Sequence, residues 1–360
     1  MKVAIRTDAS TEMGSGHVMR CMTLAEALKN NGASVIFISS KHSGNLNHLI
    51  VRKGFQIIEL EQPENKKIIN LNNGDDYIKW LGVSQMEDAE ETINAIKNDK
   101  PEWLVVDHYS IDEKWENELR PHVNKLLVID DIANRRHNCD VLLDQNYSPN
   151  GTNRYDGKIP KKTKTLIGPN YALLSPEYFK ARKSLRQRSG TIERVLIFMG
   201  GSDPDNLTTL VLQSFTSVGL QAINLDVVIG FNNTNGEAIR ALCELRGRAQ
   251  CHTSLPHLAN LMLKADLCIG AGGSTTWERF CLGLPTIVIT TGANQVHTTE
   301  ALSASDFIEY LGTASTVSAE ILEEKIRQMI NSPELLVRQS VAGQKLIDGL
   351  GAGRVAMVIK

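Results

Sequence analysis

The chain has 360 residues, of which 42% are hydrophobic and 22% charged, which are the proportions of an ordinary globular protein. Its 41 acidic and 39 basic side chains give a net charge of −2, so the composition shows no excess of Lys and Arg for binding nucleic acid or an anionic membrane. No apolar run approaches the roughly 18 residues of a membrane span, and the 6 cysteines form no C-x-x-C pair. We therefore expect a cytoplasmic protein of two domains with reduced cysteines.

The first half of the chain alternates short β-rich runs with segments of helical period, the pattern of a parallel sheet with crossover helices. Strands are predicted at Val3–Arg6, Ser34–Ile38, Leu104–Asp107, Leu126–Asp130 and Val141–Asp144. Between the first two, apolar residues recur at helical spacing from Val18 to Leu28, and Gly32 ends the pattern.

The alternation restarts after a charged stretch, and we place the linker near Arg188–Gly190. Strands are predicted at Val195–Met199, Leu225–Ile229, Leu267–Ile269 and Pro285–Ile289. Helices are predicted at Asn206–Ser217, Glu237–Leu245, His257–Leu263, Thr275–Cys281 and Thr298–Ala304. The simplest fold is α/β, with two doubly wound, Rossmann-like domains at residues 1–188 and 189–360.

The loop after the first strand carries a candidate catalytic group. Gly14 and Gly16 would let backbone N–H groups approach an anion at the start of a helix, and His17 follows directly. The helix dipole disfavours an imidazolium there, and flanking glycines leave the ring uncovered, so we interpret His17 as a general base. Arg6 and Asp8 would face the same cleft and bind polar substrate groups. The alternative is a tight turn with a capping histidine.

A second loop, FMGGSDPDNLT at residues 198–208, ends a strand in Gly200 and Gly201. Ser202, Asp203 or Asn206 would cap the next helix, and a diphosphate would rest on the backbone N–H groups. The loop lacks the Gly-Lys-Ser/Thr of a Walker A motif. The alternative is a plain strand-to-helix turn.

A third loop begins in IGAGGSTTWERF, where a strand ends in a glycine-rich turn that includes Gly273. Ser274 or Thr275 would begin a helix, and Glu278 falls one turn inside it. A carboxylate there would accept both hydroxyls of a ribose while the turn binds phosphates. Otherwise Glu278 only complements the helix dipole.

Other polar residues give weaker signals. Asp107 and Tyr109 close a strand and would line the same cleft as His17. Asp130 and Asp131 are adjacent, so they would point to opposite faces and would not form a metal-binding pair. His252 and His297 lack partners at ligand spacing, so we expect no metal site.

Eight pieces of sequence, spread from Arg6 to Gln295, resemble a known family. They are RTDAS, GSGHVMR, VVDHY, IDDIANRRHNCDVLLDQN, GPNYALL, MGGSDPDN, GAGGSTTWERFCLGLP and ANQ. In this order they resemble the UDP-2,4-diacetamido-2,4,6-trideoxy-β-L-altropyranose hydrolases of bacterial pseudaminic acid biosynthesis. That family is similar to the GT-B glycosyltransferases, particularly the one that forms lipid II. The resemblance implies two Rossmann-like domains facing across a cleft, with a C-terminal helix at Gly351–Ile359 that crosses back.

The resemblance also implies roles for individual residues. His17 matches the catalytic base, and Glu278 matches the ribose-binding carboxylate. Gly200, Gly201 and Ser274 match the UDP cradle. Other implied substrate contacts are Asn146, Tyr171, Asn294 and Gln295. Ser175 stands where the family would have an arginine, so the contact of that arginine is in doubt.

The activity implied by the resemblance is hydrolysis of the UDP-linked diacetamido sugar by attack of water at the anomeric carbon. The enzyme would be a monomer without metal or other cofactor, and its only partner would be the nucleotide sugar. The rival enzyme interpretations are a glycosyltransferase on the same scaffold and a hydrolysing UDP-sugar 2-epimerase. A nucleotide-sugar-binding module without catalysis is the non-enzymatic alternative.

Overall fold

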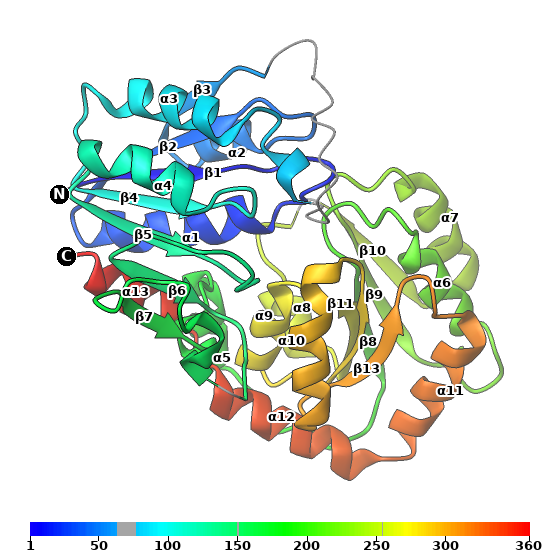
Figure 1. The fold of residues 1–360 in the computed structure, drawn as a ribbon. Helices are drawn as coiled ribbons and strands as arrows, with labels where there is room; N and C mark the ends of the chain where they lie inside the picture. The colour runs from blue at the N-terminus through cyan, green and yellow to red at the C-terminus, as the bar shows by residue number, and fades with distance from the viewer. Residues whose placement is uncertain (63–76, 150, 254) are drawn as a thin grey trace. The chain divides into compact units, whose positions relative to one another are not determined.

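The computed structural model describes residues 1–62, 77–149, 151–253 and 255–360 (Figure 1). The chain forms two compact units: unit 1 comprises Met1–Leu173 and Gly351–Lys360, and unit 2 comprises Leu174–Leu350. The division therefore falls before the expected boundary at residues 188 and 189. The intervening segment belongs to unit 2 because its side chains bond there: the Leu258 N–H donates to the Tyr178 hydroxyl oxygen, and Arg188 donates to the Gly283 carbonyl.

Unit 1 contains a seven-stranded parallel sheet in the order β3-β2-β1-β4-β5-β6-β7. Its strands are β1 (Lys2–Thr7), β2 (Ser34–Ser40), β3 (Gln56–Leu60), β4 (Trp103–Asp107), β5 (Lys125–Ile129), β6 (Val141–Asp144) and β7 (Lys164–Ile167). The five predicted strands are confirmed to within two residues at each end. The two strands that were not predicted, β3 and β7, are the edge strands of the sheet.

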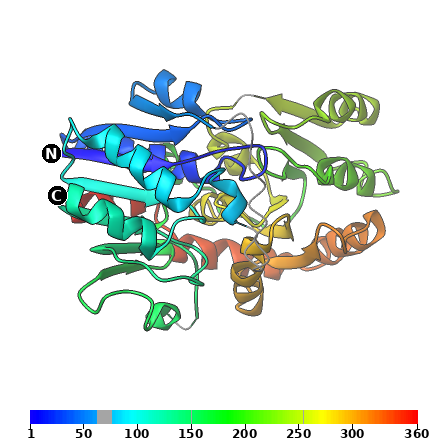
Figure 2. The same cartoon turned by 45° about the horizontal axis from the view of Figure 1, so that its top comes forward.

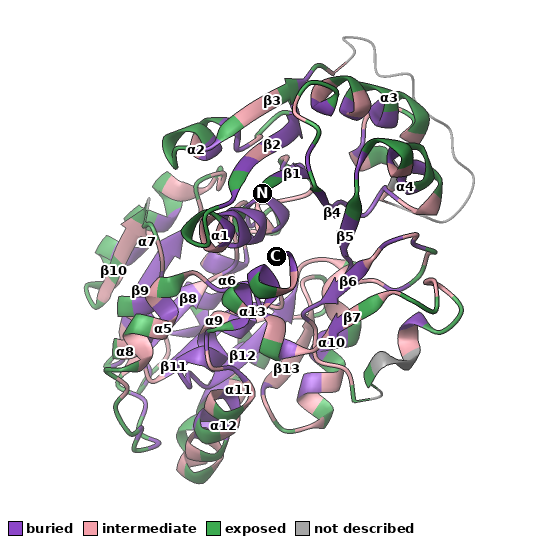
Figure 3. Cartoon of the chain, turned by 90° about the vertical axis from the view of Figure 1, so that its left-hand side faces the viewer, coloured by how far each residue is buried: buried purple, intermediate pink, exposed green. Residues whose placement is uncertain are grey.

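Both faces of this sheet are covered, so its central strands are apolar on both sides (Figure 3). Val3 and Ile5 of β1 belong to the core on the side of α1 (Gly16–Asn30). Ala4 belongs to the opposite core, which includes side chains of α3 and α4. The remaining helices of residues 1–173 are α2 (Asn47–Arg52), η1 (Ile78–Trp80), α3 (Gln85–Ile96), α4 (Glu113–Leu119), η2 (Arg120–His122), η3 (Gly151–Tyr155) and η4 (Pro169–Tyr171).

The last helix, α13 (Gly351–Val358), completes unit 1 by packing against α1. Both ends of the chain lie in this unit and are close together in two views (Figure 1, Figure 2). Val355 and Ile359 are fully buried in the same core as α1. Gly351, the first residue of the helix, packs closely on the backbone of Ala172, because a Cβ on Gly351 would lie 2.2 Å from the Ala172 carbonyl oxygen. The helix expected at Gly351–Ile359 is thus present in the first unit.

Unit 2 contains a six-stranded parallel sheet in the order β10-β9-β8-β11-β12-β13. Its strands are β8 (Arg194–Phe198), β9 (Asn224–Ile229), β10 (Ala249–Thr253), β11 (Leu267–Ala271), β12 (Thr286–Thr290) and β13 (Glu309–Thr313). Its helices are α5 (Pro176–Arg182), α6 (Leu207–Ser214), α7 (Gly236–Arg246), α8 (Ala259–Lys264), α9 (Thr275–Cys281), α10 (Ala293–Ala304), α11 (Ala319–Ile330) and α12 (Pro333–Leu346). The predicted strands and helices are all present, and β10 and β13 are additional edge strands.

The two sheets share one topology, in which the strand order reverses beside the first strand of each unit. The reversal falls between β1 and β4 in unit 1 and between β8 and β11 in unit 2. Ligands of open parallel sheets bind beyond the carboxyl ends of the strands at such a switch point. The predicted fold class, two doubly wound Rossmann-like domains, is confirmed, and the topology directs attention to the loops after these four strands. None of the described helices has the length and apolar character needed to cross a bilayer.

Candidate active site

The loop between β1 and α1 forms one side of the unit 1 switch point. Gly14 has φ +76°, a conformation that favours glycine, and its N–H donates to the Ser10 carbonyl at 2.9 Å. Ser15 stands at the N-cap of α1 without a side-chain capping bond. A Cβ at Gly14 or Gly16 would meet nothing within 4 Å. The loop therefore leaves open space at the start of a helix, as the glycine pattern predicts.

His17 is held by a carboxylate from the other side of the same switch point. Its Nδ1 lies 2.6 Å from Oδ1 of Asp107, the last residue of β4. Burial alone would raise the pKa of Asp107, but Arg20 and His17 outweigh it and hold that pKa well below its usual range. An ionised Asp107 accepts a hydrogen bond from Nδ1–H, which leaves Nε2 as the nitrogen that can accept a proton. Among the described residues, no group hydrogen-bonds Nε2.

The expectation that flanking glycines leave His17 uncovered is wrong. The residue is only 6% exposed, because the edge of the imidazole packs against the Tyr109 ring with centroids 4.5 Å apart. The Trp80 ring lies further away, with a centroid distance of 6.3 Å. The prediction considered only the glycines on the same loop and could not include the Tyr109 ring, which follows β4, or the Trp80 ring of η1. His17 is thus fixed on one edge by Asp107 and packed by aromatic side chains.

Arg20 and Asp131 extend this contact into a network that the sequence did not predict. Arg20 Nε and Nη2 donate to the two oxygens of Asp107, both at 2.6 Å. Arg20 Nη1 donates to Asp131 Oδ2, which also accepts the Tyr109 hydroxyl at 2.8 Å. Arg20 follows His17 by three residues on the same helix, a spacing that places both side chains on one face. That spacing, which lies within the GSGHVMR piece, is the sequence feature from which a contact of Arg20 with His17 could have been predicted.

Arg6 and Asp8 do not face a ligand, so the prediction of direct substrate contacts is corrected. Both are fully buried and pair with each other, with Arg6 Nη1 2.5 Å from Asp8 Oδ1. Arg6 also donates to Asp88 and to the Ser40 hydroxyl. Buried charges are stable in proteins when they are paired in this way. The pair therefore supports the carboxyl edge from inside the protein.

Three further predicted contacts also have structural partners. The Tyr109 side chain is 5% exposed and its hydroxyl is bonded to Asp131, so it lies behind His17 rather than in open space. Asn146 donates to Asp131 Oδ1 at 3.2 Å. Tyr171 packs on the apolar core beside α13. Asn146 and Tyr171 are half-buried, and these contacts join them to other residues of unit 1.

Asp130 and Asp131 lie just after β5 and not in the strand, and they turn to different partners. Asp130 Oδ1 lies 3.0 Å from Arg135 Nη2, whereas Asp131 contacts the Arg20 network. His252 bonds to Asp226 at 2.8 Å. Across the described ranges, no group of three or more His, Cys, Asp and Glu side chains could hold a metal ion.

The loop after β8 is bound to its own unit at several points. Gly200 has φ +96°, and a Cβ added to it would meet open space. The Gly201 carbonyl oxygen packs closely on Gly230, so that a Cβ on Gly230 would lie 2.2 Å from this oxygen. Asn206 has φ +51° and accepts a bond from Thr209 Oγ1 at 2.8 Å. Ser202 is half-buried. A ligand atom therefore has open space next to Gly200.

Asp203 is a helix cap, and its predicted role in substrate binding is corrected. Its two carboxylate oxygens accept the backbone N–H groups of Leu207 at 2.9 Å and Thr208 at 3.0 Å. The side chain is therefore the acceptor at the start of α6, and it is only 2% exposed. A diphosphate placed on these two N–H groups would displace a carboxylate. The predicted cap is confirmed, but it blocks this part of the predicted diphosphate site.

The loop after β11 leaves the backbone donors that follow Gly272 without a partner in the described structure. Gly273 has open space at its Cβ position, and Ser274, at the N-cap of α9, makes no side-chain capping bond. Among the described residues, no acceptor is bonded to the N–H groups of Gly273, Ser274 or Thr275. This turn therefore fits an anion better than the start of α6 does.

Glu278 lies one turn inside α9 with an unsatisfied carboxylate oxygen. Its Oε2 is buried and has no hydrogen-bond partner in the described structure. Burial raises the pKa of Glu278 to about 7, although a hydrogen bond from Tyr178 acts in the opposite direction. A buried acceptor without a partner calls for an explanation, and a ligand donor supplies one. Tyr178, which the sequence did not single out, is the protein group that contacts this carboxyl.

Gln295 holds two loops together, while Asn294 lies beside it at the start of α10. Gln295 Oε1 accepts the N–H of Gly272 at 3.2 Å and the N–H of Thr291 at 3.1 Å. The side chain thus links the turn after β11 to the turn after β12. The structure gives Gln295 a positioning role next to Gly273. Ser175, where the resemblance suggests an arginine, instead caps α5 through the Glu177 N–H.

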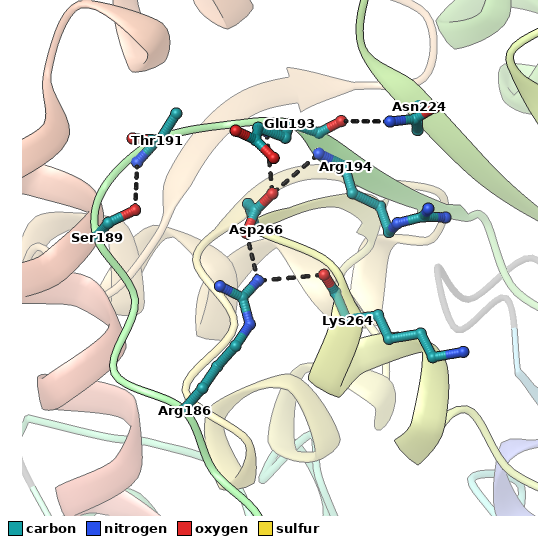
Figure 4. A pocket seen from close by; sticks show the side chains of 8 residues that line it. All are labelled: Arg186, Ser189, Thr191, Glu193, Arg194, Asn224, Lys264 and Asp266. Atoms are coloured by element: carbon teal, nitrogen blue, oxygen red, sulfur yellow. Dashed lines mark hydrogen bonds and ion pairs between the residues drawn. The ribbon is translucent and has the colours of Figure 1, made fainter.

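A cavity of about 340 Å³ lies in unit 2 at the amino-terminal ends of the strands, opposite their carboxyl ends (Figure 4). It is lined by Arg186, Ser189, Thr191, Glu193, Arg194, Asn224, Lys264 and Asp266. These residues stand at the amino ends of β8, β9 and β11, where ligands of parallel sheets do not bind. Its Asp266 carboxylate is already engaged, since it accepts from Arg186 and from two backbone N–H groups. The cavity is therefore not the candidate site.

The sequence resembles one domain family and several other proteins. Residues 195–347 match the glycosyltransferase family 28 C-terminal domain. An uncharacterized protein of Methanocaldococcus jannaschii is 29% identical over 80% of this chain, which spans 55% of that protein's length. The spore coat polysaccharide biosynthesis protein SpsG of Bacillus subtilis is 24% identical, over 100% of this chain and 98% of its own. A UDP-2,4-diacetamido-2,4,6-trideoxy-β-L-altropyranose hydrolase of Campylobacter jejuni is 26% identical, over 78% and 89%.

Solved structures support the fold. MurG of Acinetobacter baumannii superposes with a TM-score of 0.67 at 15% identity, covering 99% of both chains. The spinosyn rhamnosyltransferase SpnG gives 0.69 at 14% identity over 100% of both. Arabidopsis thaliana UGT89C1, solved in complex with UDP, gives 0.68 at 10% identity over 99% and 98%. The chain therefore has a GT-B fold, residues 195–347 match the glycosyltransferase family 28 C-terminal domain, and the sequence is similar to that of the Campylobacter jejuni hydrolase.

Proposed function

We propose that this chain hydrolyses UDP-2,4-diacetamido-2,4,6-trideoxy-β-L-altropyranose to UDP and 2,4-diacetamido-2,4,6-trideoxy-L-altrose. The observation that carries the proposal is the contact between His17 Nδ1 and Asp107 at the switch point of unit 1. A base oriented by a carboxylate is the arrangement that general-base catalysis needs. The Campylobacter jejuni relative, whose name states this hydrolysis, supports the choice of reaction. The product would enter pseudaminic acid biosynthesis, which serves flagellin or surface polysaccharide.

In the proposed reaction, unit 1 supplies the base. His17 Nε2 accepts a proton from water while the water oxygen bonds to the anomeric carbon and the bond from that carbon to the diphosphate oxygen breaks. Asp107 keeps the proton on Nδ1, so that Nε2 presents its lone pair, and the carboxylate stabilises the imidazolium that forms. His17 then loses the extra proton to solvent. UDP leaves with the electron pair of the broken bond.

Unit 2 would hold the nucleotide. The unpaired N–H groups of Gly273 and Ser274 and the open position at Gly200 are suited to phosphate oxygens. Glu278 Oε2, buried without a partner, would accept hydroxyl hydrogens of the ribose. Charge that develops on the leaving diphosphate is then already neutralised by hydrogen bonds, which lowers the barrier to its departure.

A glycosyltransferase is the second candidate, favoured by the match of residues 195–347 to a glycosyltransferase domain. In that reaction the hydroxyl of an acceptor replaces water at the same base. The two reactions differ in one requirement: a hydrolase releases UDP without an acceptor. A hydrolysing 2-epimerase also releases UDP, but its sugar is inverted at carbon two.

The test is UDP release from a panel of UDP-sugars in ¹⁸O-labelled water. The proposal predicts label in the free sugar, whereas label in UDP would mean attack at phosphorus. We expect His17→Asn to lower the rate by about 10²–10⁴-fold with little change in UDP binding, because general-base catalysis contributes about that much. His122→Asn, at an exposed histidine of η2, is the matched control. An unchanged rate in His17→Asn removes this residue from the mechanism.

A further inference from the structure

The charged side chains that support His17 have a net charge that is not zero. Asp107 and Asp131 both accept hydrogen bonds from Arg20, whose Nη2 also lies 3.3 Å from His17 Nδ1. Two carboxylates and one guanidinium leave a net charge of −1. Arg20 is 7% exposed and Asp107 is fully buried, so water screens this charge poorly.

The neighbouring groups are neutral or paired with other carboxylates: Arg154, which donates to the Asp131 backbone carbonyl, is paired with Asp144 at 2.9 Å. Burial lowers the pKa of His108, which follows Asp107 on the chain, and so favours its neutral form. Burial raises the pKa values of the Cys21 thiol and the Tyr109 hydroxyl, so both stay protonated. Arg135, whose guanidinium lies 5.9 Å from the centroid of the Tyr109 ring, is paired with Asp130.

We propose that Arg20 and Asp131 are positioning residues that set the proton affinity of His17 through Asp107, so that the buried network becomes neutral only when His17 holds the transferred proton. This inference rests on the proposed function for its catalytic meaning, but its electrostatic content does not depend on catalysis. Arg20 has two opposed effects. Its two hydrogen bonds hold the Asp107 carboxylate in place, which favours the bond to His17. Its positive charge weakens the attraction of that carboxylate for a protonated His17. Asp131 offsets part of the Arg20 charge and anchors its third nitrogen.

The proposal predicts shifts of opposite sign in two variants. Asp131→Asn removes a negative charge, so the acid limb of the pH–rate profile should move down by about 0.5–1 pH unit. Arg20→Met removes a positive charge, so the same limb should move up by about 1 pH unit. Arg20→Lys keeps the charge but loses the two-pronged bond to Asp107, so the limb should stay close to its original position while kcat falls about tenfold or more. A merely structural role would not give opposite shifts.

The experiment measures each variant in two ways. UDP release against pH reports catalysis, and the NMR titration of the His17 ring, assigned with His17→Asn, reports the proton affinity without substrate. Asp140→Asn removes a carboxylate of unit 1 that is paired with Arg120 at 2.6 Å, outside this network, and should shift neither curve. If Arg20→Met does not fold, Asp131→Asn against Asp140→Asn decides the question.

Opposite shifts in the NMR titration support the proposal, and shifts of one sign or none overturn it. If the wild-type chain releases no UDP while the NMR shifts are opposite, the proposed function fails and the electrostatic inference stands. If UDP is released and the shifts are absent, the inference fails and the proposed function stands.

Discussion

Replacing Glu278 by Gln should stabilise the protein at alkaline pH and weaken UDP binding. The pKa of this carboxyl is about 7 in the folded protein, against an ordinary value of 4.5. The folded state therefore favours the protonated form, so stability is greatest at low pH and is lost as the pH rises through 7. From these two pKa values, ionisation of Glu278 lowers the free energy of unfolding by up to about 2.5 kcal/mol more at pH 8 than at pH 5. Gln cannot ionise and avoids this loss.

The assay is urea unfolding of the wild type and Glu278→Gln at pH 5 and pH 8. The difference in unfolding free energy between the two proteins should shift by about 2–2.5 kcal/mol in favour of the variant at pH 8. Any loss from burying an amide is the same at both pH values and cancels. Glu244→Gln, at an exposed glutamate of α7, is the control and should show no such shift. An equal difference at both pH values would refute the reasoning.

The other predictions concern packing and capping. Asp203→Ala should cost about 1–2 kcal/mol of unfolding free energy, because two N–H groups at the start of α6 lose their acceptor, whereas Asp203→Asn should cost less; urea titration checks both. Gly351→Ala should cost roughly 2 kcal/mol or more, because its Cβ would lie 2.2 Å from the Ala172 carbonyl oxygen. Gly353→Ala, with nothing within 4 Å, should instead raise stability by up to about 1 kcal/mol, so equal melting temperatures of the two variants would contradict the packing argument.

The sequence predicted the central strands well because they are covered on both faces. Runs such as WLVVD in β4 and TIVIT in β12 are almost wholly apolar or β-branched and fully buried, so composition alone indicates a strand. The edge strands gave a weaker signal. QIIEL in β3 and AQCHT in β10 are polar and partly exposed, and their pairing depends on a neighbour distant in the sequence.

The sequence indicated where His17 and Glu278 lie in the fold, but not which residues contact them. Local sequence placed His17 and Glu278 after the strands that flank the two switch points, because that rule depends only on strand order. It could not show that Asp107, 90 residues away, meets His17, or that Arg20 joins them. The predictions for Arg6 and Asp8 were wrong because burial by distant segments, such as the one that carries Asp88, cannot be read from a loop. Asp203 was predicted as a possible cap, and the capping bonds themselves occupy its carboxylate.

The position of α13 has a consequence for how the protein is made. Because Gly351–Lys360 completes unit 1, the first unit to leave the ribosome lacks one of its helices until these residues have been synthesised. At about 5–20 residues per second, the intervening segment takes about 10–35 s to synthesise. Throughout that time the apolar surface that later receives Val355 and Ile359 stays bare, so the nascent chain should be a substrate for chaperones. A stop codon just before residue 351 would make that exposure permanent.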